Sequence, residues 1–404
     1  MSILFLSPTG QIGGAEAALH ELLAGLRDAH PSWSLHLVVA SEGPLVERVR
    51  TLGISVDVLP FPSALAALGD WGTGADLWST VKLLARCAAA TVPAFLYWRR
   101  LRRVLHRCRP TVIHSNGLKT HLLAAWAKPR RTPVVWHFHD FAGRRFLTST
   151  LLRHSMRRCS AIVTNSRSVA DDARLVCGHA LPVHSVWNAV DLGRFSPDGP
   201  RLDLDTLAKL PPPGNAVVRV GLVATFARWK GHHTFLEALS LLPATVPVRG
   251  YIVGGPIYET SRSQVAVADL REWAESLGIG ARVGFTGFVA DASSAIRSLD
   301  IVVHASTDPE PFGLVIAEAM ACGKAVVASR AGGAIELIDA CDDAVTHMPG
   351  DAAGLAKRIE ELAMDPGLRA RLGTSGRATA ERCFTRSRMA FELTPIYQEV
   401  AHVH

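Results

Sequence analysis

Two glutamates, Glu310 and Glu318, lie eight positions apart in the segment 308–323, which reads DPEPFGLVIAEAMACG. Pro311 keeps Glu310 out of the α-helical region, and a proline favours the first turn of a helix that follows it. Eight helical residues would span about 12 Å, at about 1.5 Å each, which is near the length of a nucleoside diphosphate that carries a sugar. We therefore predict that Glu310 holds hydroxyl groups of a sugar and that Glu318 holds those of a ribose.

The start of the same helix offers backbone donors between the two carboxylates. The N–H groups at a helix start have no partner within the helix and attract oxygen anions. The candidates for contacts with phosphate or sugar oxygens are Phe312, Gly313 and Leu314. The alternative is an ordinary proline-containing turn followed by an amphipathic helix, and the spacing alone does not separate the two interpretations.

A strand followed by a short cationic loop occupies residues 221–231, GLVATFARWKG. Arg228 and Lys230 lie beyond the carboxyl end of that strand and ahead of the next helix. Two cations there would suit the diphosphate of a leaving group, because both bind phosphate oxygens through charge-assisted hydrogen bonds. The alternative is a pair of solvated surface cations.

Two histidines close an apolar strand in WHFHD, residues 136–140. His137 and His139 share one face, because side chains alternate across a strand. His139 at the strand end could contact a sugar hydroxyl or a developing charge. A packed structural role is the second interpretation. Metal binding is the third, and it needs another ligand that the sequence does not place nearby.

Glycines follow two of the predicted strands. Gly13 and Gly14 lie in TGQIGGAE, residues 9–16, and Gly254 lies in VGGP, residues 253–256. Glycine lets the backbone approach a ligand closely, and the helix start after the first loop attracts anions. The G-x-G-x-x-G spacing of dinucleotide-binding loops is absent, so a flexible strand-to-helix turn is the alternative.

The elements that position these residues alternate between short apolar strands and helices. Alternation of this kind predicts a doubly wound α/β architecture with a parallel sheet covered on both faces. A polar stretch between DGP at 198–200 and PPPGN at 211–215 reads as a linker, after which the alternation restarts. Since 404 residues exceed one ordinary core, we predict two such domains, 1–200 and 201–385, facing across a cleft.

The composition of the chain limits the cellular compartment and the classes of binding partner that we expect. The seven cysteines are scattered without a C-x-x-C pair, so a reducing cytoplasm without a disulfide framework or a zinc site is expected. The first residues, MSILFLSP, read as a buried strand and not as a signal peptide. A net charge of +7 suits a phosphorylated substrate or a membrane surface, and no nucleic-acid-binding module accompanies it.

The longest apolar stretch, 83–98, is too short for a membrane span and runs into a cluster of arginines. We expect the segment 77–109 to be a core helix with a solvated end. The alternative is a helix that lies on an anionic membrane surface, so that the protein is cytoplasmic and peripheral to the inner membrane face.

These segments together resemble the retaining glycosyltransferases of family 4, which include glycogen-synthase-like and phosphatidylinositol-mannosyltransferase-like group 1 transferases. The resemblance runs nearly from end to end. It includes the turn Gly13–Glu16, His139, TNS at 164–166, NAVDLGRFSP at 188–197, RWKG at 228–231 and EPFG-x4-E from Glu310 to Glu318. It implies the GT-B fold, with two Rossmann-like domains and a final helix, 386–404, that returns to the first domain.

The resemblance also assigns roles to residues. Arg228 and Lys230 would bind the donor diphosphate, and Glu318 the ribose. Glu310 and His139 would lie near the donor sugar. Donor binding would further include the first loop, a strand-end glycine and a stretch that lines the base, with Gly13, Gly14, Glu16, Gly254, Gly287 and Val289 as the residues.

We accordingly predict a retaining, metal-independent glycosyltransferase that needs no cofactor and uses a UDP-, GDP- or ADP-linked sugar. The second domain would bind the donor, and the first would bind an acceptor such as a lipid-linked saccharide, a natural product or a small polyol. The leaving phosphate would take the acceptor proton, as the family's step is often described, and Glu310 would position the sugar. A nucleotide-sugar epimerase, a phosphorylase or a non-catalytic sugar-nucleotide-binding protein on the same architecture remains as the alternative.

Overall fold

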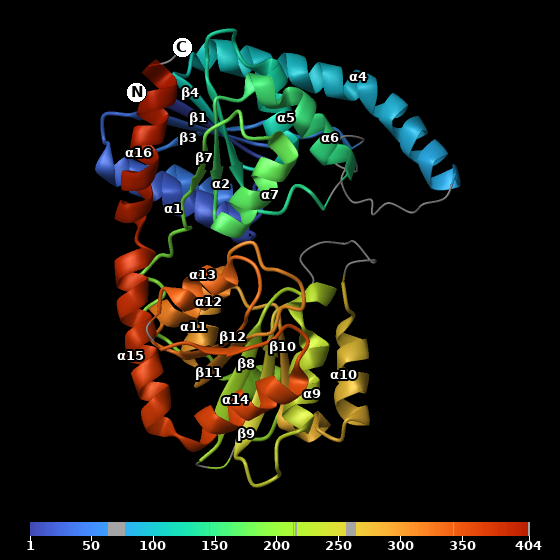
Figure 1. Ribbon diagram of the computed structural model, residues 1–404, viewed down its shortest axis with the longest axis vertical. Coiled ribbons are helices and arrows are strands. Elements are labelled where there is room, and N and C mark those ends of the chain that lie inside the picture. The colour runs from blue at the N-terminus through green and yellow to red at the C-terminus, as the bar shows by residue number, and fades with distance from the viewer. Residues whose placement is uncertain are drawn as a thin grey trace. The chain divides into compact units, whose positions relative to one another are not determined.

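The computed structural model describes the chain except residues 64–76, 145, 213, 215, 256–263, 342 and 403–404, and it does not describe the side chains of 77–88, 90 and 146–147. It divides into two units (Figure 1). Unit 1 comprises Met1–Ala189 and Arg386–His404, and unit 2 comprises Val190–Thr385.

Unit 1 is built on a seven-stranded parallel sheet in the order β3-β2-β1-β4-β5-β6-β7. Its strands are β1 Ser2–Ser7, β2 Ser34–Val39, β3 Ser55–Val58, β4 Val112–Ser115, β5 Val134–Phe138, β6 Ala161–Thr164 and β7 Val183–Ser185. Its helices are α1 Gly14–Ala29, α2 Pro44–Thr51, α4 Leu77–Cys108, α5 Leu118–Ala127, α6 Phe146–Ser155, the 3₁₀ turn η1 Met156–Arg158, α7 Arg167–Cys177 and α16 Arg386–His402.

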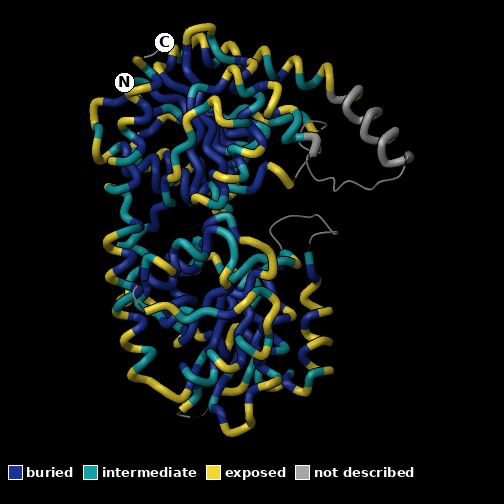
Figure 2. The backbone as a smooth tube through the Cα atoms, viewed as in Figure 1, coloured by how far each residue is buried: buried dark blue, intermediate teal, exposed yellow. Residues whose placement is uncertain are grey.

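The strands of unit 1 are largely apolar because helices cover both faces of its sheet. In β1, Ile3 and Phe5 pack with α1 and α16, whereas Leu4 and Leu6 pack with α4, α5 and α7. Side chains alternate across a strand, so a strand buried on both faces is expected to be apolar at most positions. Figure 2 shows the result, with the central strands mainly in the buried colour and most exposed residues on the helices and loops.

The final helix α16 belongs to unit 1, as the predicted GT-B topology requires. The Arg386 side chain forms an ion pair with Glu21 of α1, and His30 Nε2 lies 2.8 Å from the Thr394 hydroxyl. A Cβ at Gly25 would lie 2.6 Å from the Arg386 carbonyl oxygen, so α1 needs a glycine where α16 approaches it.

Unit 2 repeats this plan with a six-stranded parallel sheet in the order β10-β9-β8-β11-β12-β13. Its strands are β8 Val218–Val223, β9 Val248–Val253, β10 Val283–Gly287, β11 Ile301–His304, β12 Ala325–Ser329 and β13 Val345–His347. Its helices are α8 Leu204–Ala208, α9 His232–Ser240, α10 Val267–Ser276, α11 Ala292–Arg297, α12 Leu314–Ala321, α13 Ala334–Asp339, α14 Ala352–Met364 and α15 Pro366–Cys383, with 3₁₀ turns η2 Arg228–Lys230 and η3 Gly280–Arg282. The predicted two-domain α/β fold is therefore confirmed.

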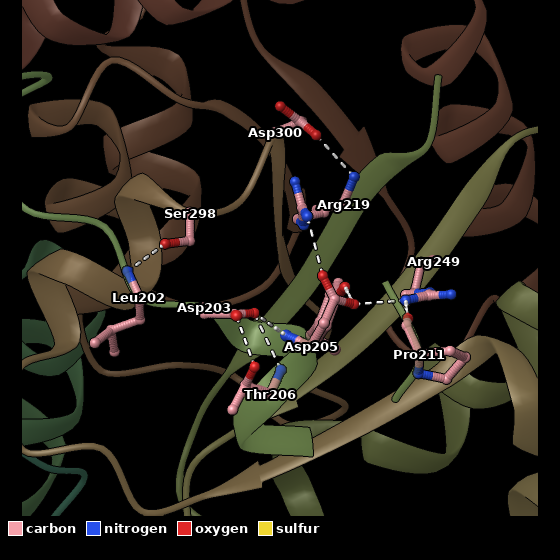
Figure 3. A network of polar contacts seen from close by, with 10 residues as sticks. Leu202, Asp203, Asp205, Thr206, Pro211, Arg219, Arg249, Ser298 and Asp300 are labelled. Carbon is pink, nitrogen blue, oxygen red and sulfur yellow. Dashed lines mark hydrogen bonds and ion pairs between the residues drawn. The ribbon is translucent and has the colours of Figure 1, made fainter. Parts of the chain in front are cut away.

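The stretch interpreted as a linker is instead packed into unit 2, and that interpretation was wrong. Asp203 caps α8, and Asp205 inside this short helix accepts hydrogen bonds from Arg219 at 3.0 Å, Arg249 at 2.6 Å and the Tyr251 hydroxyl at 2.5 Å (Figure 3). Burial alone would raise the pKa of Asp205, but these donors hold it below its usual value. Composition marked the stretch as polar, whereas its partners lie in β8 and β9 and are invisible locally.

Within the described residues, none of the helices combines the length and the apolar character needed to cross a bilayer. The cysteines in this part of the chain are free thiols, at 108, 159, 177, 322, 341 and 383. Cys87 lies among the residues whose side chains are not described.

Candidate active site

The candidate active site of unit 2 lies where the winding of its sheet reverses. The chain runs from β8 outward to β9 and β10, then returns to the other side of β8 with β11. In open parallel sheets, ligands bind at such a reversal, outside the carboxyl ends of the strands. Lys230 follows β8 and Glu310 follows β11, so two predicted site residues flank this point.

Glu310 is the centre of a compact polar cluster. Lys230 Nζ donates to both of its carboxylate oxygens, at 2.9 Å and 2.8 Å. The Ser306 hydroxyl donates to Oε2 at 2.8 Å, and His304 Nε2 lies 3.1 Å from the same oxygen. The Ser329 hydroxyl in turn donates to the Ser306 carbonyl at 2.7 Å. The carboxylate is therefore held in one orientation by strand ends and loops of the same unit.

This cluster keeps Glu310 ionised. The residue is 7% exposed, and burial alone would raise its pKa. The charge of Lys230, followed by the hydrogen bond from His304, reverses that effect and holds the pKa of Glu310 well below its usual value. A buried anion beside a cation with 18% of its side chain exposed makes a preorganised electrostatic site.

Close backbone approaches support the same cluster. Gly231, directly after Lys230, has φ 74°, and a Cβ there would lie 1.8 Å from the Ala305 carbonyl oxygen. The main chain of Glu310 forms a parallel bridge with Gly332, and its carbonyl accepts from the Gly333 N–H at 2.6 Å. Glycine is needed at both contacts because a side chain would separate the loops.

Arg228 differs from Lys230 in its surroundings. It lies in the same 3₁₀ turn, η2, but its side chain is exposed and has no hydrogen bond or ion pair with the part of the chain that the structure describes. Lys230, by contrast, lies 3.9 Å from the ring centroid of Trp229 and is paired with Glu310. Of the two predicted phosphate cations, Lys230 is thus held by an ion pair, whereas Arg228 has no partner among the described residues.

Glu318 lies in α12, as predicted, but the helix begins only at Leu314. The segment from Glu310 to Gly313 is a loop anchored by the bridge to Gly332, so the eight residues that separate the two glutamates are not all helical. The loop ends at Gly313, whose φ of 94° lies in the left-handed region. The helix begins directly after Gly313, and the left-handed conformation of this glycine could not be read from spacing alone.

The remaining predicted donor contacts of unit 2 lie around the carboxyl edge of its sheet. Phe312 is buried and packs edge-on against Phe384, with ring centroids 6.2 Å apart, so its side chain serves the core. Gly254 follows β9, with φ 147° and with its N–H donating to the Gly287 carbonyl at 3.0 Å. Gly287 ends β10 with φ 74°, and Val289 is half-buried two residues later.

A second set of predicted residues lies in unit 1, again beside a reversal of winding, here between β1 and β4. His139 follows β5, and its Nε2 lies 2.6 Å from Asn116 Oδ1. Its ring contacts that of His137, with centroids 4.0 Å apart, which confirms that the two histidines share a face. His137 Nδ1 lies 3.3 Å from His114 Nε2, and the Tyr397 hydroxyl of α16 lies 2.9 Å from His114 Nδ1.

Burial keeps these histidines uncharged. It lowers the pKa of His139 to about 3. Burial, with a smaller contribution from His139, lowers the pKa of His114 to about 3. Burial also lowers the pKa values of His137 and of His121 in α5, with smaller contributions from the neighbouring histidines. His137 is fully buried and belongs to the packed network, whereas His139 as a whole is partly exposed although its Nδ1 is buried.

The loop after β1 leads directly into the start of α1. Gly13 caps α1, and Glu16 Oε2 accepts from the Gly13 N–H at 3.2 Å, so this carboxylate has a local structural partner. Burial raises the pKa of Glu16. Gly14 is exposed, and a Cβ there would meet nothing within 4 Å.

Sequence reasoning missed several residues of these sites, among them His304, Asn116 and Tyr397. His304 is the last residue of an apolar strand, and His139 directly follows one. A histidine at a strand end is therefore the signal that could have revealed His304. Asn116 follows a strand ending in His-Ser, whereas Tyr397 carries no local signal because its partner His114 is 283 positions away. In the described part of the chain, a metal-type grouping occurs only at His36, Asp57 and Cys108, with ligand atoms within 4.8 Å, and there Arg107 and His36 already engage Asp57.

Comparison with known proteins identifies relatives of both units. The family model described as glycosyl transferases group 1 matches residues 217–379, and the model described as glycosyltransferase family 4 matches residues 12–194. The chain is 32% identical over 269 residues to the lipopolysaccharide core biosynthesis glycosyltransferase LpsE of Rhizobium meliloti, which covers 66% of this chain and 73% of LpsE.

Two further comparisons cover most of the chain. The lipopolysaccharide core biosynthesis mannosyltransferase LpcC of Rhizobium leguminosarum bv. viciae is 30% identical over 305 residues, or 75% of this chain and 80% of LpcC. The crystal structure of Anabaena HepE in complex with UDP-glucose is similar with a TM-score of 0.78 at 26% identity, covering 99% of this chain and 100% of HepE.

Proposed function

Because the chain belongs to the group 1 and family 4 glycosyltransferases and therefore transfers glycosyl groups, we propose the finer chemistry of its reaction. It moves a sugar from a nucleotide-sugar to an acceptor hydroxyl, with retention at the anomeric carbon and without a metal ion or other cofactor. The observation that carries this proposal is the Lys230–Glu310 pair beside the reversal of winding in unit 2.

The donor binds to unit 2 in this proposal. Lys230 and Arg228 offset the negative charge that builds on the departing diphosphate, since a cation held in place before the reaction needs no reorganisation during it. The exposed Arg228 has room to fold onto a phosphate, because no ion pair holds it in the described residues. Glu318 binds the ribose, and the Gly287–Val289 stretch lines the base.

Glu310 acts as a positioning and electrostatic group, with its two oxygens already engaged by Lys230, Ser306 and His304. The acceptor oxygen bonds to the anomeric carbon on the face from which the diphosphate departs. The bond from that carbon to the phosphate oxygen breaks, and this oxygen takes the acceptor proton. An oxocarbenium-like sugar beside the buried carboxylate is stabilised by its negative charge.

The comparisons suggest which substrates to test first. The HepE structure contains UDP-glucose, so UDP-linked sugars are the first donors to test. LpsE and LpcC are named for lipopolysaccharide core biosynthesis, so a saccharide on a lipid carrier is the first acceptor to test. In the proposal, unit 1 binds the acceptor, and the Gly13–Gly14 loop approaches the donor phosphates.

A lipid-linked acceptor would agree with peripheral contact between α4 and an anionic membrane on the cytoplasmic side. Phe95 and Leu96 are 53% and 50% exposed, and Arg99, Arg102 and Arg103 follow on the same helix. Trp98 and these arginines line an open hollow of about 450 Å³ together with His106. Apolar and cationic side chains on one helix suit the interface of an anionic bilayer.

The membrane proposal has a direct test. Wild-type protein should sediment with phosphatidylglycerol vesicles and not with phosphatidylcholine vesicles, and Arg99→Glu together with Arg102→Glu should abolish sedimentation. Absence of wild-type sedimentation with anionic vesicles would refute the membrane contact and leave the transfer chemistry untouched.

Transfer itself is tested with UDP-, GDP- and ADP-linked sugars and a panel of saccharide acceptors, with NMR of the product anomer. The expected product keeps the donor's anomeric configuration, and addition of EDTA leaves the rate unchanged. Donor conversion without any acceptor would support the epimerase alternative. Binding of the nucleotide with the donor left intact by every acceptor would support a non-catalytic protein.

A further inference from the structure

Asn116 joins the candidate histidine of unit 1 to the start of helix α1. It follows β4 directly and is 3% exposed. Its Oδ1 lies 2.6 Å from His139 Nε2, and its Nδ2 lies 3.3 Å from the carbonyl oxygen of Ala15, the second residue of α1. One buried amide therefore touches the predicted substrate histidine and the helix that begins at Gly14.

The two contacts together determine the orientation of the amide. The Ala15 carbonyl oxygen can only accept a hydrogen bond, so the group that faces it is the NH₂ of Asn116. The amide oxygen then faces His139. Since that oxygen can only accept, His139 must donate from Nε2. The position of the proton on a histidine ring is usually assigned from its hydrogen-bond partners. Here the contacts of Asn116 with Ala15 and His139 allow only one assignment, with the proton on Nε2.

The other ring nitrogen of His139 then carries a lone pair. The imidazole is neutral, because burial lowers the pKa of His139 to about 3. The titratable groups near it are His114 of β4, His121 of α5 and His137 of β5, which burial also keeps uncharged. His139 Nδ1 is buried and has no partner among the described residues. A buried acceptor without a donor is costly, and a substrate donor would relieve that cost.

We propose that Asn116 is a positioning residue that holds His139 in the neutral tautomer with its proton on Nε2, so that Nδ1 accepts a hydrogen bond from a substrate hydroxyl. The identity of that hydroxyl, on the donor sugar or on the acceptor, rests on the proposed function. A phosphate oxygen, which also only accepts, cannot bind at Nδ1. His139 thus recognises the sugar and not the diphosphate.

The first experiment needs no substrate. Long-range ¹H–¹⁵N NMR of the full chain labelled with ¹⁵N-histidine distinguishes the two neutral tautomers, and His139→Gln identifies the His139 signals. The expected result is a protonated Nε2 and an unprotonated Nδ1 at neutral pH. A proton on Nδ1, or a doubly protonated ring, overturns the proposal. The spectrum remains informative even if the protein transfers no sugar.

Variants of Asn116 then test whether this residue determines the tautomer of His139. Asn116→Leu removes the acceptor, so the His139 signals should shift toward a mixture of tautomers. Asn116→Asp keeps the acceptor and adds a negative charge, so the Nε2–H tautomer should persist and the pKa of His139 should rise. An unchanged His139 spectrum in folded Asn116→Leu overturns the positioning role. If neither variant folds, the wild-type spectrum still decides the tautomer.

Asn165 provides a matched control, because it is also buried and adjacent to His139. Its Nδ2 donates to the main-chain carbonyl of His139 at 3.4 Å and not to the ring. Asn165→Ser should leave the tautomer unchanged. In the transfer assay, Asn116→Leu should lower kcat on the order of 10-fold to 100-fold, the loss that a displaced contacting group produces, with little change in the KM for the donor. A wild-type kcat in that variant would contradict the role in positioning.

Discussion

Lys230 Nζ lies 2.9 Å from one carboxylate oxygen of Glu310 and 2.8 Å from the other. The pair joins the loop after β8 to the loop after β11, 80 positions later in the chain. The cation and the anion that the resemblance assigns to opposite ends of the reacting bond are thus paired with each other in the fold. This arrangement makes each residue structurally dependent on the other.

The dependence predicts an asymmetric response to mutation. Lys230→Met leaves the Glu310 carboxylate buried without its cation and should lower the free energy of unfolding by about 3 kcal/mol. The double variant Lys230→Met with Glu310→Leu should lose less, because no charge remains buried alone. Urea unfolding measures both. Arg358→Met is the control, since Arg358 and Glu361 form an exposed pair, and it should change stability by less than about 1 kcal/mol.

Substitution of Arg228, unlike that of Lys230, should leave the stability unchanged and lower the activity. Its side chain is exposed and unpaired within the described residues, so Arg228→Ala should leave the unfolding free energy within about 0.5 kcal/mol of wild type. If it binds the leaving diphosphate, kcat/KM should fall by an amount equivalent to about 2–4 kcal/mol. Lys357→Ala, at an exposed position of α14, should change neither quantity. Near-normal transfer by Arg228→Ala would remove it from the leaving-group site.

A substitution at Gly14 should affect donor binding without lowering the stability of unit 1. A Cβ at this position would meet nothing within 4 Å, and alanine is a better helix former than glycine at the start of α1. Gly14→Ala should therefore fold with at least wild-type stability. If donor phosphates approach this backbone, the added methyl group should raise the KM for the donor. Wild-type kinetics in Gly14→Ala would argue against that approach. Gly53→Ala would be a poor control because its φ of 68° strains any side chain.

The buried histidines predict that unit 1 loses stability in acid. The folded state binds no proton at His114 or His139 until the pH approaches about 3, whereas the unfolded chain binds them near pH 6.5. Between these values the unfolded state holds more protons, so stability falls as the pH falls, with a slope of up to about 1.4 kcal/mol per pH unit for each such histidine. Above pH 7 this contribution should be flat. Denaturant unfolding at pH 7.5 and pH 5 tests it, and equal stability at both would contradict the buried neutral state.

Glu318 provides a prediction about binding. Glu318→Ala should weaken the affinity for free UDP, measured by calorimetry, because a carboxylate that accepts from both ribose hydroxyls would be lost. Binding of inorganic pyrophosphate should be unchanged, since it carries no ribose. An unchanged affinity for UDP in a variant that still binds it would count against the ribose role.

Much of the fold could be predicted from the local pattern of apolar and polar residues. Most strands of the two sheets fall on apolar runs of the sequence, because strands covered on both faces are largely apolar. The segment from Glu310 to Glu318 was likewise predicted as a turn followed by a helix, and the structure shows both. Periodicity and residue type suffice for such features, since each depends on neighbours along the chain.

The contacts that define the site could not be read in this way. Glu310 is joined to Lys230, His139 to Asn116 and Tyr397 to His114 across 80, 23 and 283 positions. The sequence alone determined which residues carry charge, lone pairs or flexible backbone, and where each strand ends. Only the folding of parallel strands into two sheets with reversed winding decided which of those ends are neighbours, because hydrogen bonds between side chains depend on distance in space and not on separation along the chain.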